Sequence, residues 1–381
     1  MHFDLTREQE LIRQTVREFA EKEIAPRARH VDETGEFPAE TFAKMGQLGL
    51  MGLPFPEEYG GAGADTISAA IAVEEVARVC GSTALAYAAH MGLGSAPIAM
   101  FGTEEQKRKF LVPAARGEYL GAFGLTEPHA GSDAGATRTR AVLEGNEWVI
   151  NGQKMWITNA PIAGHLIVTA VTDPERGKKG ISAFIIPRGT PGLSFGKHEP
   201  KMGLRGSIST AVMLEHVRVP KENMLGERGH GFVQFLRVLD GGRISIGAMA
   251  VGLAQGAYEA AVRYAREREA FGKPIGMHQS VANMIADMEV GIETARLYVY
   301  KAAWLKDQHR HFHREAAVAK LYASEVSEKI CRDAIQIFGG YGYSQEFPVE
   351  RMYRDTRLLT IGEGTSEILR NVISHGVLGF R

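Results

Sequence analysis

Apolar residues recur at helical spacing through the first third of the chain. Thr6 and Gln9 have the spacing of a capping box, and apolar positions then follow every three or four residues from Ile12 until Pro26. We expect an amphipathic helix that ends at this proline. Alanine-rich segments of the same period continue, separated by glycine and proline, and predict an all-helical domain over residues 1–120.

The pattern changes near Tyr119. Short runs of β-branched and aromatic residues follow, divided by turn signals such as Asn151-Gly152. These runs predict a β domain over residues 121–226, either a small barrel or a sandwich. The clearest runs cover residues 148–150, 166–171, 181–186 and 211–219.

Helical spacing returns after Gly231 and is kept over long segments. Apolar residues follow one another every three or four positions from Val281 to Ala302, which favours a helical bundle. We therefore expect a C-terminal bundle over residues 227–381. Helices, then strands, then helices, without strand and helix alternation, predict an α+β multidomain protein rather than a doubly wound sheet.

The charge balance argues against a polyanionic partner. The 381 residues include 44 Lys and Arg against 45 Asp and Glu, a formal net charge of −1. No net positive field is present to collect nucleic acid or an anionic membrane, so local groups must hold any anionic ligand. We expect no nucleic-acid partner.

Cysteine usage and the apolar runs bear on location. Cys80 and Cys331 are the only cysteines and lie far apart in the sequence, which suits a reducing compartment. The first ten residues are rich in charge, and no uninterrupted apolar run approaches the roughly 18 residues of a membrane span. These features predict a cytoplasmic protein with no membrane partner.

The stretch IGEGTSEILRN contains a carboxylate between two glycines. Glu363 lies between Gly362 and Gly364, directly before a predicted helix capped by Thr365 or Ser366. Because glycine has no side chain, these two neighbours would leave the carboxylate accessible to a ligand. An ordinary loop has the same composition. The fragment alone leaves both interpretations open.

Two further stretches, GAFGLTEPHAGSDAG and KMWITNA, lie at the entry to the β domain and inside it. The small or hydroxylated residues Thr126, Gly131 and Ser132 let backbone amides approach a ligand closely. Trp156 offers a flat face and Thr158 a hydrogen-bond donor, which suits a planar cofactor. Trp156 could instead be an ordinary core aromatic.

Three histidines, His309, His311 and His313, alternate along the chain. Alternate residues on a helix point in different directions, and no cysteine or carboxylate cluster completes a site. We expect no metal site here.

Five motifs together resemble one family. GLTEPHAGSDAG, KMWITNA, REREAFGKPIGMHQ, QIFGGYGYSQEFPVERMYRD and IGEGTSEI occur in the order and approximate spacing of the acyl-CoA dehydrogenase family of flavoproteins. The resemblance covers essentially the whole chain, including the order of helices and strands. It implies FAD as cofactor, an acyl-CoA substrate, an electron-transferring flavoprotein as partner, and a homotetramer whose neighbouring subunits share the cofactor site.

The resemblance also implies roles for single residues. Arg268 is the expected cation for the FAD pyrophosphate, supplied by a neighbouring subunit, although by its local sequence it could be a solvated charge. The implied cofactor-binding positions are Phe123, Leu125, Thr126, Gly131, Ser132, Trp156, Ile157, Thr158, Arg268, Phe271, Gln279, Gln336, Ile337, Gly339, Gly340, Thr365, Ser366 and Glu367.

Glu363 matches the family's catalytic base. The resemblance implies that its carboxylate removes the α-proton of an acyl-CoA thioester while the β-hydrogen leaves as hydride to flavin N5, giving a trans-2-enoyl-CoA. The thioester carbonyl would accept hydrogen bonds from a flavin ribityl hydroxyl and the backbone N–H of the base. Burial raises the pKa of such a carboxyl and a following helix lowers it, so the sequence leaves the direction open.

The segment LDGGR matches the CoA side of the site. Asp240 and Arg243 correspond to substrate contacts, together with Ser132 and Gly364, although the first two could be a surface ion pair. Some family members place the base in this segment. Gly242 fills that position here, so we expect no second base.

One departure from the family bears on the substrate. Many straight-chain members have tyrosine just before the base, whereas this chain has Gly362. The missing ring should widen the acyl pocket and admit branched acyl groups. A flavin oxidase or monooxygenase on the same fold, or a non-catalytic nucleic-acid-associated flavoprotein, is the alternative function.

Overall fold

The computed structural model describes residues 4–379 and begins with helices. These are α1 Arg7–Phe19, α2 Ala28–Thr34, α3 Ala39–Gln47, α4 Thr66–Val79, α5 Gly81–Ala88, α6 Ala96–Phe101, α7 Glu104–Gln106 and α8 Val112–Ala115. The predicted capping box opens α1, because the Thr6 hydroxyl accepts a hydrogen bond from the Gln9 N–H and the Gln9 side chain accepts one from the Thr6 N–H. The all-helical prediction for this part is confirmed.

Pro26 does not end the first helical run. After α1 the chain makes a wider helical turn over Ala20–Ile24 and a tighter one over Ala25–Arg27, and α2 follows directly. Pro26 lies at the start of the tighter turn, where a backbone N–H is not needed for an internal hydrogen bond. The predicted helix end at this proline is therefore wrong.

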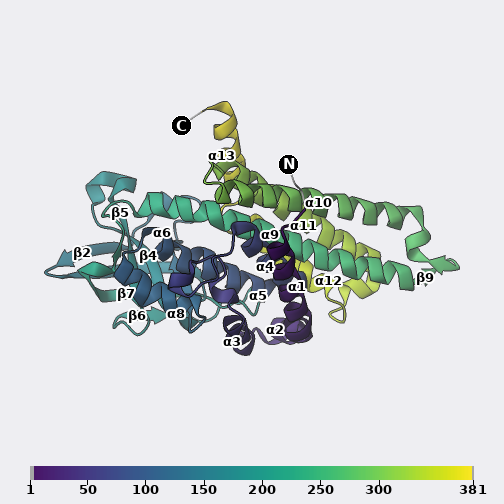
Figure 1. Cartoon of the computed structure of the whole chain (residues 1–381), viewed down its shortest axis with the longest axis horizontal. Coiled ribbons are helices and arrows are strands. Elements are labelled where there is room, and N and C mark those ends of the chain that lie inside the picture. Colours follow the sequence, from purple (N-terminus) through teal and green to yellow (C-terminus); the bar gives the residue numbers. More distant parts are fainter. Residues whose placement is uncertain (1–3, 380–381) are drawn as a thin grey trace.

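The middle of the chain forms one eight-stranded sheet. Its strands are β1 Leu120–Gly124, β2 Arg140–Glu144, β3 Glu147–Thr158, β4 Ala163–Val171, β5 Ile181–Pro187, β6 Leu193–Phe195, β7 Ser209–Pro220 and β8 Met224–Leu225. Their order is β6-β7-β3-β2-β4-β5-β8, and β1 pairs with β4 in parallel. Figure 1 shows the sheet at one end of the molecule. Trp148, Ile150 and Phe184 lie in its own core.

Asn151-Gly152 does not form the predicted turn, because it lies inside β3. The pairing of β3 with β7 changes register between Ile150 and Gly152, so the extra residue forms a bulge. A side chain at Gly152 would not fit, since its Cβ would lie 2.4 Å from Thr139 Oγ1. Because the bulge accommodates the extra residue, β3 continues past Asn151-Gly152 to Thr158.

Long helices form the rest of the chain. They are α9 Gly231–Glu267, α10 Gln279–Asp307, α11 His313–Phe338, α12 Val349–Thr356 and α13 Ser366–Leu378, with a short hairpin of β9 Glu269–Ala270 and β10 Lys273–Pro274. The predicted C-terminal bundle is confirmed. Figure 1 shows α9 running from the sheet to the hairpin at the opposite end of the molecule, beside α10 and α11.

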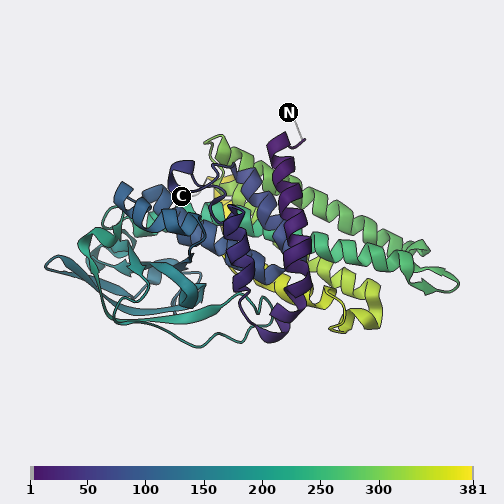
Figure 2. The same ribbon diagram turned by 60° about the horizontal axis from the view of Figure 1, so that its bottom comes forward.

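The helices before and after the sheet share one hydrophobic core. Figure 2 shows the N-terminal helices, in purple and blue, lying across the long green helices. Glycines bring α4 and α9 into close contact, since a Cβ at Gly252 would lie 2.2 Å from the Glu74 carbonyl oxygen. At Gly256 the corresponding distance, to the Arg78 carbonyl oxygen, is 2.1 Å. The sequence predicted these segments as separate units, and packing joins them.

One helical run within this core, Gly81–Phe101, is long and apolar enough to cross a membrane, with a mean hydropathy of 1.2. It was not expected from the sequence, where no uninterrupted apolar run was found. In the structure, 67% of its most apolar window is buried inside the protein. A core helix of a soluble protein has the same composition, so packing accounts for the apolar character of this run.

Candidate active site

The turn that carries Glu363 has a left-handed backbone. Glu363 has φ 52° and Gly364 φ 97°, and the first value is uncommon for a residue with a side chain. Helix α13 begins directly after this turn. Of the two predicted caps, Thr365 is the one used, because its hydroxyl accepts a hydrogen bond from the Ile368 N–H at 3.3 Å.

The Glu363 carboxylate lies against helix α9 at Gly242. A Cβ atom at Gly242 would lie 2.2 Å from Glu363 Oε2, so no side chain fits at this position. Within residues 4–379, Oε2 is buried and has no hydrogen-bond partner. A buried carboxylate oxygen without a partner is costly, and this indicates a site that a bound molecule completes.

Burial sets the acidity of this group. It raises the pKa of Glu363 to about 7, while the positive charges of Lys320 and Arg243 oppose the shift. The sequence left this direction open because burial is a property of the folded chain. A carboxyl group with a pKa near neutrality is suited to take up and release a proton at physiological pH.

Arg243 and Asp240 form an ion pair of 2.9 Å on α9 beside this carboxylate. The pair is not at the surface, because the Arg243 side chain is only 4% exposed. His313, at the start of α11, contacts the same Asp240 oxygen at 2.6 Å. Burial lowers the pKa of Arg243, although Asp240 and Glu363 counteract it. The site therefore contains a buried cation next to its acid.

Lys320 is absent from the residues that the sequence predicted. It lies on α11, is 0% exposed, and its Nζ donates a hydrogen bond to the Gly364 carbonyl oxygen at 2.7 Å. The one available signal was a single lysine inside the small, apolar segment AAVAKLYA. A lysine on the apolar face of a helix is unusual unless the structure gives it a partner.

On the β domain, β3 presents Trp156 to solvent. The register shift between Lys154 and Ile157 forms a bulge, in which Trp156 adopts φ 63° and is 56% exposed. Lys154 and Ile157 are both buried. The alternative of a core aromatic therefore does not hold. The bulge turns a flat ring outward, where it can stack on a planar ligand.

The segment after β1 lies beside this bulge. The Thr126 carbonyl oxygen accepts a hydrogen bond from the Met155 N–H at 2.8 Å. Gly131 and Ser132 are exposed, and nothing lies within 4 Å of the Cβ position at Gly131. Backbone groups of this segment are thus open to a ligand.

A buried ion pair that the sequence did not predict supports this segment. Lys154 Nζ lies 2.8 Å from Glu127 Oε1 and donates to the Leu125 carbonyl oxygen at 3.2 Å. Burial acts to raise the pKa of Glu127, but the Lys154 ammonium and the hydroxyls of Thr137 and Thr139 outweigh it and lower the pKa to about 2. The buried Lys154 ammonium and Glu127 carboxylate therefore form an ion pair beneath the exposed segment.

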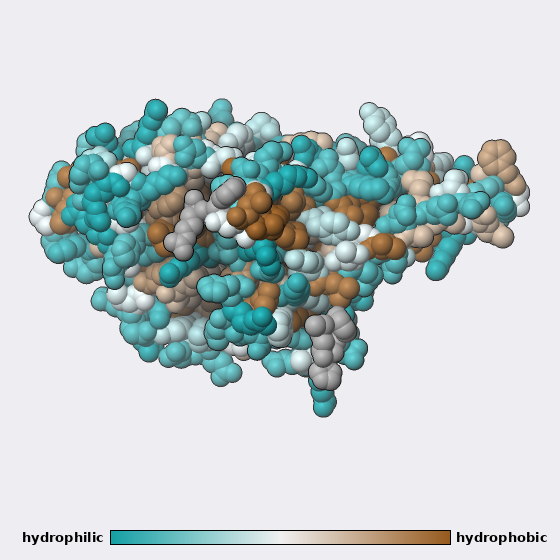
Figure 3. Space-filling model, turned by 90° about the horizontal axis from the view of Figure 1, so that it is seen from above, coloured by the Kyte–Doolittle hydropathy of each residue, from teal (hydrophilic) through white to brown (hydrophobic). Residues whose placement is uncertain are grey.

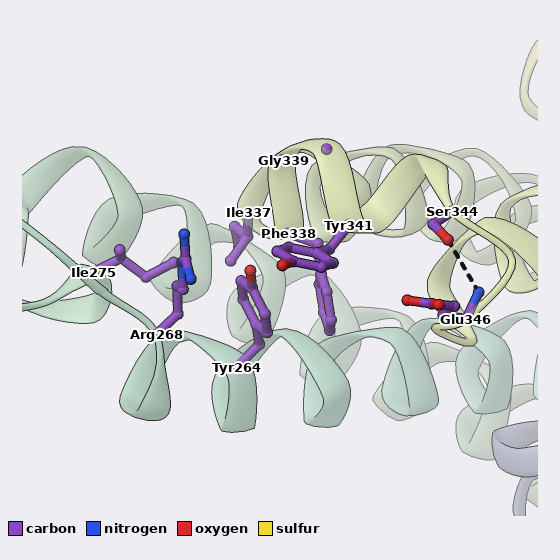
Figure 4. Close-up of a pocket in the computed structure, with 10 residues that line it drawn as sticks. Tyr264, Arg268, Ile275, Ile337, Phe338, Gly339, Tyr341, Ser344 and Glu346 are labelled. Atoms are coloured by element: carbon purple, nitrogen blue, oxygen red, sulfur yellow. Dashed lines mark hydrogen bonds between the residues drawn. The ribbon is translucent and has the colours of Figure 1, made fainter.

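A second group of predicted residues lines a cavity of about 590 Å³, shown in Figure 4. Arg268 follows the end of α9, and Ile337, Gly339 and Gly340 lie at the end of α11. The Arg268 guanidinium lies 5.8 Å from the centroid of the Tyr341 ring. The cavity therefore combines a cation, aromatic rings and an open glycine turn.

The two groups lie far apart in one chain. Gly242 and Arg268 are 26 residues apart along α9, which corresponds to roughly 39 Å at the rise of an α-helix.

Several other predicted positions lie outside both groups. Phe123 packs on Phe235, Phe271 is 96% exposed at the hairpin, Ser366 is buried at the start of α13, and Gln279, Gln336 and Glu367 are exposed.

These features fit FAD. The exposed Trp156 ring and the open segment at Gly131 suit a flat ring system, and Arg268 suits a pyrophosphate. The Glu363 oxygen that has no partner among the described residues lies in the helical part of the molecule, apart from these features.

Three acyl-CoA dehydrogenase domains match the chain. The N-terminal domain matches residues 6–118, the middle domain residues 122–217 and the C-terminal domain residues 229–378.

Relatives of the same length agree. The chain is 58% identical over 379 residues to a probable acyl-CoA dehydrogenase, YngJ, of Bacillus subtilis, and the match covers 99% of this chain and 100% of that protein. It is 53% identical over 374 residues to a short-chain specific acyl-CoA dehydrogenase of Clostridium acetobutylicum, covering 98% of this chain and 99% of that protein.

Solved structures match over the whole chain. Butyryl-CoA dehydrogenase from Megasphaera elsdenii superposes with a TM-score of 0.98 at 44% identity, covering 99% of this chain and 100% of that one. A chain from a study of the electron transferring flavoprotein of Acidaminococcus fermentans gives 0.98 at 47% identity, with coverage of 99% and 100%. An acyl-CoA dehydrogenase complexed with FAD from Bacillus anthracis gives 0.93 at 36% identity, with coverage of 99% and 67%. The chain therefore belongs to the acyl-CoA dehydrogenase family of FAD-dependent oxidoreductases.

Proposed function

We propose that the protein dehydrogenates an acyl-CoA thioester between its α and β carbons, giving a trans-2-enoyl-CoA, with Glu363 as the base. One observation carries the proposal. The Glu363 carboxylate lies against Gly242, has an oxygen that is buried and unpartnered among residues 4–379, and has its pKa raised to about 7. A carboxylate in this state is suited to remove the α-proton of a thioester at neutral pH.

The chain supplies two further parts of this chemistry. Arg243 and Lys320 favour the ionised form of the base before proton transfer. Nothing in residues 4–379 accepts a hydrogen bond from the Glu363 backbone N–H, so it is free to donate to the thioester carbonyl. A donor of this kind contributes about 3 to 4 kcal/mol of transition-state stabilisation.

FAD, when bound, supplies the acceptor for the β-hydrogen, which leaves the substrate as hydride. Trp156 and Thr158 would hold the flavin end of the cofactor, and Arg268 its pyrophosphate. Anaerobic mixing of the purified protein with an acyl-CoA tests the reaction. Bleaching of the flavin absorbance together with formation of an enoyl-CoA supports it. FAD-loaded protein that no acyl-CoA bleaches would show that the reaction is wrong.

We propose a short acyl chain, with room for a branch next to the α and β carbons. The relatives named short-chain specific and butyryl-CoA dehydrogenase support the length. Gly362 supports the branch, since the nearest atom to a Cβ placed there is the Leu358 carbonyl oxygen at 3.7 Å. Rates of flavin reduction across straight and branched thioesters test both points.

The variant Gly362→Tyr should lower the rate for branched thioesters more than for straight ones, because its ring would fill the space beside Glu363. Gly362→Ala is the matched control and should change the preference little. An unchanged preference in the tyrosine variant would show that Gly362 does not set substrate shape.

We propose that the electrons pass to an electron-transferring flavoprotein. The match to a chain from the Acidaminococcus fermentans study supports this choice. Flavin reduced by substrate should reoxidise slowly in air and rapidly with an electron-transferring flavoprotein. Fast reoxidation in air with release of hydrogen peroxide would instead identify an oxidase.

We also propose a homotetramer in which neighbouring chains share the cofactor. The cavity beside Arg268 and the site at Glu363 are separated by roughly 39 Å along α9, so a second copy is needed for both to serve one FAD molecule. Figure 3 shows brown, apolar residues on the upper face of Figure 1, where α10 and α13 lie. The exposed apolar side chains on these two helices include Val290, Leu297, Val377 and Leu378. Light scattering of the purified protein gives the number of chains.

A further inference from the structure

Lys320 is a buried lysine without an ion-pair partner. Its side chain lies in α11 among alanines that are fully buried, and within residues 4–379 no carboxylate oxygen lies within 4.0 Å of its Nζ. Among the residues that the structure describes, the ammonium makes one hydrogen bond, to the Gly364 carbonyl oxygen at 2.7 Å. Lys154, the other fully buried lysine, is paired with Glu127 at 2.8 Å. Burial of an ammonium without an ion-pair partner is unfavourable, which suggests that Lys320 has a specific role at this position.

The bond from Lys320 acts on the turn of the base. Glu363 has φ 52° and Gly364 φ 97°, and a left-handed backbone is unfavourable for a residue with a side chain. The ammonium donates to the carbonyl oxygen of Gly364, the residue that directly follows Glu363. It thereby ties the turn to the middle of α11, which is itself packed in the helical core.

The charge of Lys320 acts on the carboxylate without occupying it. Lys320 makes no hydrogen bond to Glu363, and Glu363 Oε2 stays without a partner among the described residues. A direct salt bridge would take up the lone pair that must receive the proton. A cation held at a greater distance favours the ionised form and leaves that lone pair free.

We infer that Lys320 is a positioning residue for the catalytic base, which fixes the turn through Gly364 and keeps Glu363 ionised through its charge. The inference rests on the proposed role of Glu363 as base. It assigns two separable tasks to one ammonium: a hydrogen bond and a charge.

Other charges act on the same pair of groups. Burial lowers the pKa of Lys320 to about 8. The carboxylate of Glu363 counteracts this shift, the guanidinium of Arg243 adds to it, and Glu325 and Glu367 counteract it more weakly. Asp240 and His313 reach the site through Arg243. Among the described residues, Lys320 and Arg243 are the two cations that lower the pKa of Glu363, so removal of Lys320 leaves one of them.

Three substitutions separate the two tasks. Lys320→Arg keeps the charge and a donor, Lys320→Gln keeps a donor without charge, and Lys320→Met removes both. Lys329→Met is the matched control, because Lys329 lies on the same helix with an exposed side chain. Each FAD-loaded protein is assayed for substrate-driven flavin reduction between pH 5.5 and pH 9. Infrared difference spectra against Glu363→Gln follow ionisation of the carboxyl group without turnover.

Lys320→Gln should raise the midpoint of the pH–rate profile and of the infrared titration by about one pH unit. The reason is that a nearby opposite charge lowers a carboxyl pKa by that much or more. The rate of this variant at pH 6 should fall about tenfold while its rate at pH 9 stays near wild type. Lys320→Met should be slower at every pH, because the turn is also released. Lys320→Arg and Lys329→Met should keep the wild-type midpoint.

Wild-type midpoints in Lys320→Gln and Lys320→Met would overturn the inference. Loss of folded, FAD-loaded protein in all three variants, arginine included, would overturn it as well, because the lysine would then act in packing alone. If wild-type protein reduces no flavin with any thioester, the proposed function fails. The infrared titration still tests the action of Lys320 on Glu363 in that case.

Discussion

Glu363 and Gly242 come from segments 121 residues apart and meet at a distance that leaves no space for a side chain at the glycine (363 − 242 = 121). The sequence indicated both residues, one as a base and one as an empty alternative position. It contained no sign that they touch. Their contact explains why α9 has no side chain opposite the Glu363 carboxylate, since any Cβ at position 242 would displace that carboxylate.

Gly242→Ala should therefore lower the rate of flavin reduction by about 10² or more, because it displaces a base that contributes roughly 10² to 10⁴. The helix itself should be no less stable, since alanine favours a helix over glycine by about 1 kcal/mol. Gly241→Ala is the control, because its Cβ would meet only Lys306 Nζ, at 3.4 Å. Equal rates in the two variants would contradict the contact as described.

Glu363→Gln should lose flavin reduction yet gain stability above neutral pH. Burial raises the pKa of Glu363 to about 7, above that of an exposed glutamate, so the folded state resists ionisation. The stability that this group contributes is full at low pH and is lost as the pH rises from about 4.5 to about 7. Above that window the uncharged glutamine should be favoured by on the order of 3 kcal/mol.

Thermal unfolding at pH 4.5 and pH 8 measures this difference. The two proteins should unfold at similar temperatures at the lower pH, and the variant at a higher temperature at the upper pH. For the wild type, the rate of substrate-driven bleaching should rise with pH with a midpoint near 7. A midpoint near 4.5 would show that the carboxyl is not shifted as described.

The site residues that the sequence identified lie in recognisable motifs, whereas the residue that it missed does not. Glu363, Asp240 and Arg243 stand in recognisable motifs. Lys320 stands in an alanine-rich helix without a motif, and its relevance appears only once Gly364 is seen beside it. The direction of the pKa shift at Glu363 likewise needed the burial that folding creates.

Among the elements, β3 shows where local signals fail. The Asn151-Gly152 pair is typical of a tight turn. Here β3 pairs with β7 on both sides of this pair, so the strand continues through it. The same strand contains a second bulge, which turns Trp156 outward while Lys154 and Ile157 point into the protein. Spacing along the chain predicts neither bulge, because both are set by the register of a strand some 50 residues later in the sequence.

The ion pair beneath that bulge should matter for stability. Lys154→Met leaves the Glu127 carboxylate buried without its cation and should cost about 3 to 5 kcal/mol in urea unfolding followed by tryptophan fluorescence. Adding Glu127→Leu to the same chain should recover much of the loss. Arg218→Met breaks an exposed pair with Glu144 and should change the stability far less, because water screens that pair. Equal losses for the two single variants would contradict the assigned role.

The pH dependence of this element follows from Glu127. Its pKa is lowered to about 2 in the folded protein, so the folded state favours the ionised form. The stability it contributes is present above about pH 4.5 and is lost as the pH falls toward 2. The Lys154→Met/Glu127→Leu protein should lose less stability than wild type over this range.

For the whole molecule, the order of helices and strands was predictable but the joining of the two helical parts was not. Composition and period do not reveal that Gly252 and Gly256 let α4 lie directly on α9. The family resemblance likewise named the cofactor positions and assigned Arg268 to a neighbouring subunit, but it gave no distances between them. The length of α9 separates these positions into two groups, which supports the proposed sharing of the cofactor between chains.

Hybrid assemblies test the shared site. Chains with Arg268→Ala should lose FAD and chains with Glu363→Gln should lose bleaching by substrate. When both are co-expressed, a site that takes Glu363 from one chain and Arg268 from another is intact in part of the hybrids. Random mixing should then restore about a quarter of the wild-type sites. No recovery in hybrids confirmed to contain both chains would show that each chain builds its site alone.

The clash between positions 242 and 363 also limits how this chain could evolve. A glutamate at position 242 would enter the volume already filled by the Glu363 carboxylate, because its Cβ alone would lie 2.2 Å from Oε2. Relocation of the base therefore cannot proceed by gaining the new acid first. A lineage that moved it had to pass through a form with no acid at either place, or change both codons together, and such a crossing is expected to be rare.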